Sequence, residues 1–517
     1  MTAKTRYDVL SSTRSQYLNT ADEAAKLTIP YLIDQIDDKV GYKKTKTPWQ
    51  SVGAKGVVTL SAKLMMSLLP PQTSFFKLQV DESQLGDYGP EVKSELDLAF
   101  AKVERTILES IAASDDRVTV HQAMKHLVVT GNALIFMGKD GLKLFPLSRY
   151  VIDRDGNGNV IEIVTKERIN RKTIEELIPS IKTDDMDGAS DDDNKDCDVY
   201  THAKVNGNKI VWHQEVFDKI IPKSQGKAPL STTPWLPLRF NVVDGEDYGR
   251  GRVEEFMGDL KSLEALSQAL VEGSAAAAKV VFTVSPSSST KPATLAAAGN
   301  GAIIQGRPDD IGVVQVAKGN DFATAYQQIG TIEKRLAEAF LILSVRQSER
   351  TTAEEVRMTQ MELEQQLGGL FSLLTVEFLV PYLDRKLSVM QKSRSIPRIP
   401  RNIVKPTIVA GINALGRGQD RESLTMFMQT IAQTVGPEAM MQFINPDEVI
   451  KRLAAASGID VLNLVKSMKE IQGEQQQQME QQMAMQQQEQ APAMAAVEQK
   501  QMQAEMQMAQ QAQQPPG

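Results

Sequence analysis

The sequence predicts an α+β fold that is mainly helical, with long helices and two small β-rich regions. Three observations predict it. Apolar residues recur at helical spacing through most of 1–129. Short apolar runs separated by glycine turns fill 132–241 and 279–321, which is typical of strands. A helical pattern then runs from 353 to 392, and a helix of that length spans roughly 60 Å at 1.5 Å per residue.

The middle of the chain reads as a helix followed by a small β insert. The helix, over 251–278, begins after Tyr248 and closes on a run of alanines. The insert, over 279–321, is rich in Val, Ile, Ser, Gly and Pro. Alternating apolar residues predict strands at 280–284 and 302–304 within it.

A second helix, a short polar loop and the long helix follow the insert. They are expected at 322–343, 344–352 and 353–392. Gly368-Gly369 and Pro381 interrupt the long helix, and both kinds of residue are recognised causes of kinks. A rod of this length is more typical of an assembly that spans a distance than of a globular enzyme.

The N-terminal part is expected to be helical, with one early strand at 75–80. Ser11 and Ser12 offer capping chemistry to the first helix, and Pro30 ends it. Gly53 and Gly56 allow close packing of the second helix; a phosphate loop at this point lacks the Walker spacing and follows no strand. The predicted helices are 1–35, 50–69, 91–113 and 118–129.

A β region follows these helices, and the turn 153–158 opens one of its hairpins. The turn resembles the start of a calcium-binding EF-hand loop, but Val164 stands where the twelfth ligand should be Glu, and strands flank it. The Asn-Gly pair inside it is a strong hairpin signal. The predicted strands are 133–138, 142–146, 150–153, 161–165, 200–204, 209–215 and 235–241.

The stretch 184–198 is rich in Asp, with Ser and Gly, and is interpreted as a solvated loop; a calcium cluster is the alternative. The single cysteine, Cys197, falls at its end. With one cysteine the chain has no internal disulfide and no multi-cysteine zinc site. We interpret Cys197 as an incidental thiol.

Composition excludes a DNA-binding protein that works by bulk charge. The net charge is −7 and the sequence pI is about 5.5, whereas such proteins are basic. A few placed arginines can still contact phosphate. The N-terminus has no apolar signal core and no apolar run reaches 18 residues, so we expect a soluble protein of a reducing cytoplasm, with no membrane contact.

No motif for catalysis or metal binding stands out. The Walker, nucleophile-elbow, zinc-protease and dinucleotide signatures are absent from the sequence. His121 and His126 are five apart, whereas metal pairs on one helix face are three or four apart. We therefore expect no enzyme, no catalytic residue, no metal site and no cofactor.

Several stretches, in order and over about 1–465, resemble the head-to-tail connector, or portal, family of short-tailed bacteriophages (autographivirus type). As a set they are specific, although each alone would be weak. They are Thr47 to Gly56 with Ser61 to Met65, Leu127 to Leu134, Asp244 to Arg250, Gly306 to Ile311, Arg350 to Arg357 and Ala414 to Asp420.

The resemblance implies a ring, usually of twelve subunits, with a portal fold of named parts. These are a wing at 1–247, stem helices at 248–278 and 322–343, a clip at 279–321, a channel loop at 344–352, a long kinked wing helix at 353–395 and a crown at 396–470. A helical block over 420–464 belongs to the crown. The Gln/Met-rich tail, 471–517, has no clear match and is expected to be disordered or a helix that needs partners.

The resemblance also implies sites and partners. Double-stranded DNA would face the loop residues Arg346, Gln347, Ser348, Glu349 and Arg350, and the clip would dock proteins through Lys291, Arg307, Asp309 and Asp310. Implied partners are the terminase large subunit, the tail adaptor, the major capsid and scaffolding proteins, and internal core proteins. The implied place is a capsid vertex of the virion, after assembly in the host cytoplasm.

Three alternatives remain open at this level. The chain could be a motor or nuclease subunit of the packaging machine, although the missing nucleotide and metal motifs argue against this. It could be a scaffold or adaptor whose rod and tail bind partner helices without touching DNA. Arg346 and Arg350 could pair with Glu349 or with acids of a neighbouring subunit rather than with phosphate.

Overall fold

The structure is a computed structural model that divides into two compact units, Met1–Leu415 and Gly416–Gly517. The residues that it describes are 1–33, 45–70, 75–80, 90–139, 141–170, 173–174, 196–277, 281–288, 290–299, 301–305, 307–314, 319–342, 368–397, 404–408, 417–434, 436, 449 and 500–506. The channel loop predicted at 344–352 lies outside them.

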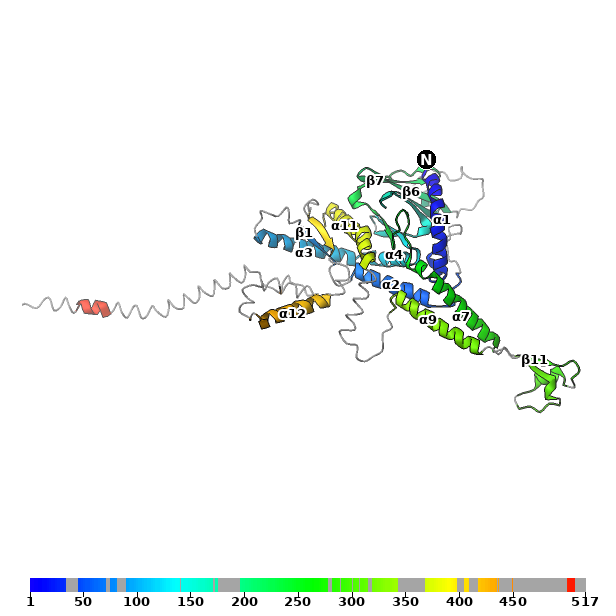
Figure 1. Ribbon diagram of the computed structural model, residues 1–517. Helices are drawn as coiled ribbons and strands as arrows, with labels where there is room; N and C mark the ends of the chain where they lie inside the picture. The colour runs from blue at the N-terminus through cyan, green and yellow to red at the C-terminus, as the bar shows by residue number, and fades with distance from the viewer. Residues whose placement is uncertain are drawn as a thin grey trace, which may run out of the picture. The chain divides into compact units, whose positions relative to one another are not determined.

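The helices of the first unit confirm the predicted order (Figure 1). The helix expected at 251–278 is interrupted at Phe256, so that a short α6 precedes a long α7. The bounds are α1 Ala3–Lys26, α2 Val52–Leu68, α3 Pro90–Ala112, α4 Asp116–Thr130, α6 Arg252–Glu255, α7 Met257–Ala277, α8 Pro292–Ala297, α9 Gly319–Ala339 and α11 Val380–Lys392. Of the long rod, the described part is the helical residues 368–374, a π-helical turn Thr375–Leu379, and α11.

The described strands form four antiparallel sheets, in the orders β10-β2-β3, β4-β5-β6-β7-β8 with β9 beside β7, β11-β12, and β1-β13. The predicted hairpin at 153–158 joins β4 and β5. The bounds are β1 Phe76–Val80, β2 Asn132–Met137, β3 Leu142–Phe145, β4 Tyr150–Arg154, β5 Val160–Asn170, β6 Asp196–Asn206, β7 Lys209–Val216, β8 Lys219–Ile220, β9 Gly226–Pro229, β10 Trp235–Arg239, β11 Val281–Val284, β12 Ile311–Val314 and β13 Val404–Ile408.

Two sequence interpretations need correction in these sheets. Cys197 is a buried residue of β6, not part of an acidic loop, because it packs with Val199 and Val216 in a small apolar cluster. In the insert, the strand predicted at 302–304 is absent, and β11 pairs instead with 311–314 of the same chain. The side chain of Ile303 is fully exposed. The apolar residues at 302–304 therefore lie in an exposed segment and do not mark a strand.

The main apolar core lies where α2, α4 and α11 meet the sheet β10-β2-β3. Leu64, Leu127, Leu134 and Tyr382 are fully buried in it. No helix in the described part of the chain is long and apolar enough to cross a membrane.

Helix α1 begins earlier than its serines suggested. Thr2 is its N-cap residue, and the Thr2 hydroxyl accepts a hydrogen bond from the Thr5 amide. Ser11 and Ser12 lie inside the helix, where their hydroxyls donate to carbonyls three residues back. The prediction that they cap the helix was wrong, because a hydroxyl can bond back along its own helix as well as cap.

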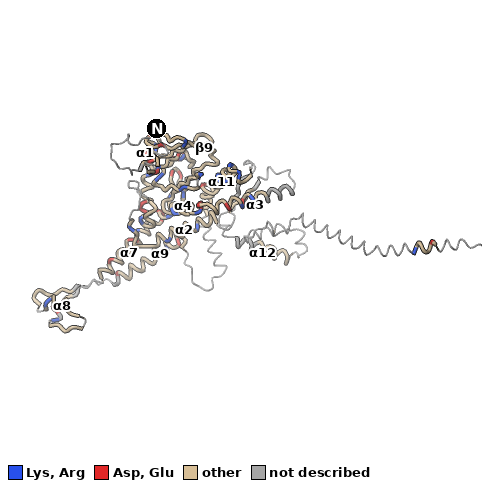
Figure 2. The backbone as a smooth tube through the Cα atoms, turned by 180° about the vertical axis from the view of Figure 1, so that it is seen from behind, with Lys and Arg blue, Asp and Glu red and all other residues tan. Residues whose placement is uncertain are grey.

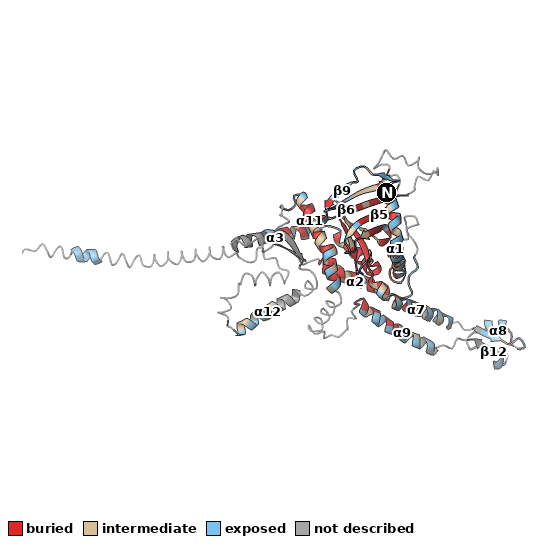
Figure 3. Cartoon of the chain, turned by 45° about the horizontal axis from the view of Figure 1, so that its top comes forward, coloured by how far each residue is buried: buried red, intermediate tan, exposed pale blue. Residues whose placement is uncertain are grey.

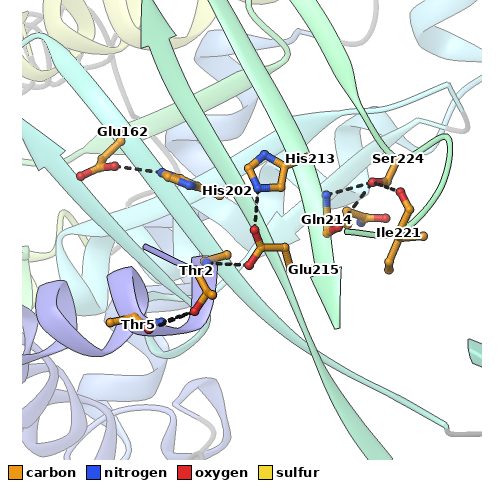
Figure 4. Close-up of polar contacts among 10 residues, drawn as sticks. Thr2, Thr5, Glu162, His202, His213, Gln214, Glu215, Ile221 and Ser224 are labelled. Carbon is orange, nitrogen blue, oxygen red and sulfur yellow. Dashed lines mark hydrogen bonds and ion pairs between the residues drawn. The ribbon is translucent and has the colours of Figure 1, made fainter. Parts of the chain in front are cut away.

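Two carboxylates hold the start of α1 on the large sheet, and a histidine supports each of them (Figure 4). Glu215 accepts from the Ala3 amide at 2.6 Å and lies 2.8 Å from His213. Glu162 pairs with Arg6 of α1 and lies 2.9 Å from His202. The wing predicted at 1–247 therefore has its first helix fixed to its sheet at defined points.

The second unit is described mainly by α12, Arg417–Thr434. It covers the first part of the helical block expected at 420–464. Residues 500–506 of the Gln/Met-rich tail are helical; for the rest of that tail the two alternatives stay predictions.

Candidate functional site: the helical pair, its insert and its anchor

Helices α7 and α9 lie side by side and carry the insert between them (Figure 1). Arg335 of α9 pairs with Asp259 of α7 at 2.9 Å. Nearer the insert, Gly273 allows close approach, because a Cβ there would lie 2.8 Å from the ring of Phe322. The predicted stem helices therefore form an antiparallel pair within one chain.

This pair leaves most of its surface to solvent (Figure 3). On α7 the fully buried side chains are Leu260 and Leu263, both in its first two turns. Further out, Val271 is 52% exposed and Tyr326 is 70% exposed. Two helices with so narrow a buried seam gain little stability from packing on each other alone.

The insert presents charged groups at the far end of this pair, and basic positions lie on it near α8 (Figure 2). Lys291, Arg307 and Asp309 are exposed. Asp310 is half-buried, and its carboxylate accepts from the Ser288 hydroxyl at 3.0 Å. The four predicted docking residues thus lie in the same small insert. Asp310 differs from the other three because its hydrogen bond with Ser288 links two segments of the insert.

The base of the pair is fixed by a contact among glycines that the sequence reasoning did not single out. Gly131 ends α4 in the left-handed conformation, with φ at +76°. A Cβ at Gly131 would lie 2.5 Å from the carbonyl oxygen of Gly249 and 2.6 Å from the amide nitrogen of Gly251. The Asn132 side chain exchanges two hydrogen bonds with the backbone of Gly249, each 2.7 Å long.

Gly131 and Gly249 belong to two of the stretches that carry the family resemblance, 127–134 and 244–250, and Gly251 directly follows the second stretch. The sequence therefore showed these glycines, in the patterns Thr-Gly-Asn and Tyr-Gly-Arg-Gly. Local sequence patterns do not predict that two such distant segments come into contact. Arg250, beside them, pairs with Glu246 and Glu254, and these hydrogen bonds raise its pKa. The result is a rigid base from which α6 and α7 start.

A buried ion pair links this base to the rod. Glu377 lies in the π-helical turn, and the Arg239 guanidinium of β10 donates to its Oε1 at 2.7 and 2.9 Å. Glu377 Oε2 accepts from the Arg239 amide at 2.8 Å. Arg154 lies beside this pair; burial lowers its pKa, and so does the nearby charge of Arg239.

The predicted kink residues fall on both sides of that turn. Gly368 and Gly369 are in regular helix, and Pro381 is at the second position of α11, two residues after the π-helical turn ends at Leu379. Proline cannot donate to the carbonyl four residues earlier and its ring crowds that carbonyl, which favours a wider turn before it. The kink itself stays a prediction.

Helix α11 is tied to α4 through its first two turns. The Asp116 carboxylate, buried at the start of α4, accepts from the Tyr382 hydroxyl at 2.6 Å and from Lys386 at 3.0 Å. Burial, together with the neighbouring Asp116 charge, raises the pKa of Tyr382. The rod is therefore held on the core at two points, Glu377 and Asp116.

The loop predicted to face DNA, Arg346 to Arg350, lies outside the described residues. Among the residues that the structure describes, no group of three or more His, Cys, Asp or Glu side chains could hold a metal ion. Of the two histidines on α4, His126 is buried and His121 is half-buried.

Buried His126 gives a prediction about pH. Burial, and to a lesser extent Lys125, lowers its pKa from 6.5 to about 4. Between those values the unfolded chain binds a proton that the folded chain does not, so stability falls as the pH falls from 6.5 to 4. The loss over the full window is about 3 kcal/mol. Urea unfolding at pH 7 and pH 4.5 should show a smaller loss for His126→Gln than for the parent; equal losses would contradict it.

Known proteins match this chain over most of its length. A family model described as bacteriophage head to tail connecting protein matches residues 1–465. The portal protein of Enterobacteria phage T3 is 37% identical over 476 residues, which cover 90% of this chain and 88% of that protein. The portal protein of Escherichia phage T7 is 36% identical over 484 residues, covering 91% and 89%. That of Enterobacteria phage SP6 is 29% identical over 479 residues, covering 91% of each.

The family match extends over the helical pair, the insert, the glycine contact at its base and the described part of the rod. The chain belongs to the family of bacteriophage head-to-tail connecting proteins.

Proposed function

We propose that twelve copies of this chain form a ring at one capsid vertex, through which double-stranded DNA enters during packaging and leaves on infection. The exposed pair α7 and α9 carries the proposal. Two helices that bury little surface against each other are stabilised when neighbouring copies of the chain pack against their exposed sides. A ring supplies two such neighbours to every copy. The head-to-tail connecting family and its portal relatives support the same reading.

In this ring the two helices surround the channel and the insert faces outward for docking. The terminase large subunit and, later, the tail adaptor bind the insert through Lys291, Arg307 and Asp309, which are exposed there. Reversing these three charges should leave ring formation intact and weaken adaptor binding. Unchanged binding would remove the docking role.

The remaining partners follow from the same position in the virion. They are the major capsid and scaffolding proteins at the vertex and internal core proteins above it, with assembly in the host cytoplasm. A motor subunit is the alternative of a different class. An ATPase assay on the purified protein separates the two, because a connector has no turnover of its own.

The proposed channel loop makes a narrower prediction. The double variant Arg346→Ala, Arg350→Ala should form rings normally but retain less DNA in filled particles, since arginine contacts phosphate without reading bases. Lys55→Ala, at an exposed cation outside the loop, is the control and should retain DNA like the parent. DNA content per particle is the measurement, and equal content in all three proteins would contradict a phosphate-contacting role.

A further inference from the structure

Helix α9 ends in a strained conformation that two cationic side chains from other helices hold in place. We propose that Lys63 and Arg252 are positioning residues, which fix the end of α9 from which the channel loop starts. The inference deepens the proposed function and rests on it for the role of that loop.

The strain is at Leu341, which has φ at +55°. The Ile342 amide donates to the Ala337 carbonyl at 2.7 Å, and the Leu341 amide donates to the Glu338 carbonyl at 3.0 Å. This pair of bonds is the Schellman ending of a helix, in which glycine is the common residue at the left-handed position. A leucine there is disfavoured by contact between its Cβ and the following carbonyl, so the surroundings must hold it.

Two cations bind the last carbonyls of α9. Lys63 of α2 donates from Nζ to the Leu341 carbonyl at 2.6 Å. Arg252 of α6 donates to the Ala339 carbonyl from Nε at 3.3 Å and from Nη2 at 3.2 Å. Positive charge at a helix C-terminus is favourable because the unpaired carbonyls there carry partial negative charge. Since the cations come from two different helices, they fix the end of α9 in two directions.

Packing beneath the carbonyls completes the anchor. Phe340 is fully buried, and a Cβ at Gly56 of α2 would lie 2.7 Å from its ring. The Arg252 guanidinium stacks over the ring of Phe256, and the centroid of that ring lies 6.1 Å from the centroid of the Phe340 ring. Arg252 Nη1 also donates to Glu255 at 2.7 Å. Partial burial lowers the pKa of Lys63, so its ammonium is partly shielded from water.

The arrangement differs from ordinary surface charge pairing. Lys63 and Arg252 bind backbone carbonyls at one site, directly before 343, so they set the direction in which the chain leaves α9. Lys55, on the same helix α2, is exposed and serves as a matched control. A change at Lys63 should act on the end of α9, and the same change at Lys55 should not.

The test uses assembled rings and filled particles of full-length Lys63→Met, Lys63→Arg and Lys55→Met. Losing a charged hydrogen bond should speed amide exchange at Leu341 and Ile342 by about tenfold to a hundredfold in Lys63→Met. Exchange should stay near the parental rate in Lys55→Met and return toward it in Lys63→Arg. DNA retention in filled particles should fall in Lys63→Met only. If Lys63→Met forms no rings, Arg252→Gln provides the same measurements.

The outcomes separate the anchor from the proposed function. Unchanged exchange in Lys63→Met would overturn the anchor. Suppose that the double variant Arg346→Ala, Arg350→Ala lowers DNA retention. Faster amide exchange in Lys63→Met with parental DNA retention would then overturn the positioning role. If that loop variant also retains DNA normally, the loop part of the proposed function has failed, whatever the exchange result.

Discussion

Gly131→Ala is expected to destabilise the protein by roughly 2–5 kcal/mol, from the cost of a left-handed alanine and of overpacking. The new methyl group would lie 2.5 Å from the Gly249 carbonyl oxygen. Backbone on both sides makes this contact, so neither side can rotate away as a flexible side chain could. Denaturant unfolding of the purified protein measures the effect.

Gly245→Ala is the matched control. Gly245 has φ at +77°, almost the value of Gly131, but no atom lies within 4 Å of its hypothetical Cβ. It should lose only about 1 kcal/mol, the cost of the left-handed conformation. Similar losses for the two variants would show that conformation alone matters and that the glycine contact does not fix the base of the pair.

Glu377→Gln is expected to cost about 3–5 kcal/mol, because it leaves the buried guanidinium of Arg239 without its counter-charge. Only 9% of the Arg239 side chain and 12% of the Glu377 side chain are exposed. The pair joins β10 to the π-helical turn, so its loss should also loosen the rod. The unfolding midpoint and amide exchange over 374–380 are the measurements.

Two further variants make this result specific. Glu333→Gln, on the exposed side of α9, should change stability by less than about 0.5 kcal/mol. The double variant Arg239→Met, Glu377→Met should recover part of the loss, since a buried apolar pair avoids the unpaired charge. A Glu377→Gln protein as stable as Glu333→Gln would mean that the pair does not hold the rod.

The elements of the fold were largely predictable because their signals are local. Apolar spacing placed α2, α3 and α4, and proline marked the end of the N-terminal helical region. The pairing of β1 with β13 was not predictable, because over 300 residues separate them and Pro406 in β13 argues against a strand. A two-stranded sheet tolerates that proline, since each strand has an unpaired edge.

The site was predictable in outline and not in its contacts. The order of helix, insert and helix follows from local residue patterns along the sequence. Its contacts join residues from distant parts of the sequence. Glu377 pairs with Arg239, Gly131 packs against Gly249, and Lys63 binds the Leu341 carbonyl. Hydrophobic periodicity carries no information about such contacts, and nothing in the sequence around Leu341 predicts its left-handed conformation.

The central claim is that this chain conducts DNA as a ring, and imaging of the purified native particle by electron microscopy, with its mass measured in parallel, tests it most directly. We expect a closed ring with about twelve copies of the 57.0 kDa chain and an open axial hole wide enough for a DNA duplex. A stable monomer or dimer under all conditions, or a particle without an axial hole, would contradict the account.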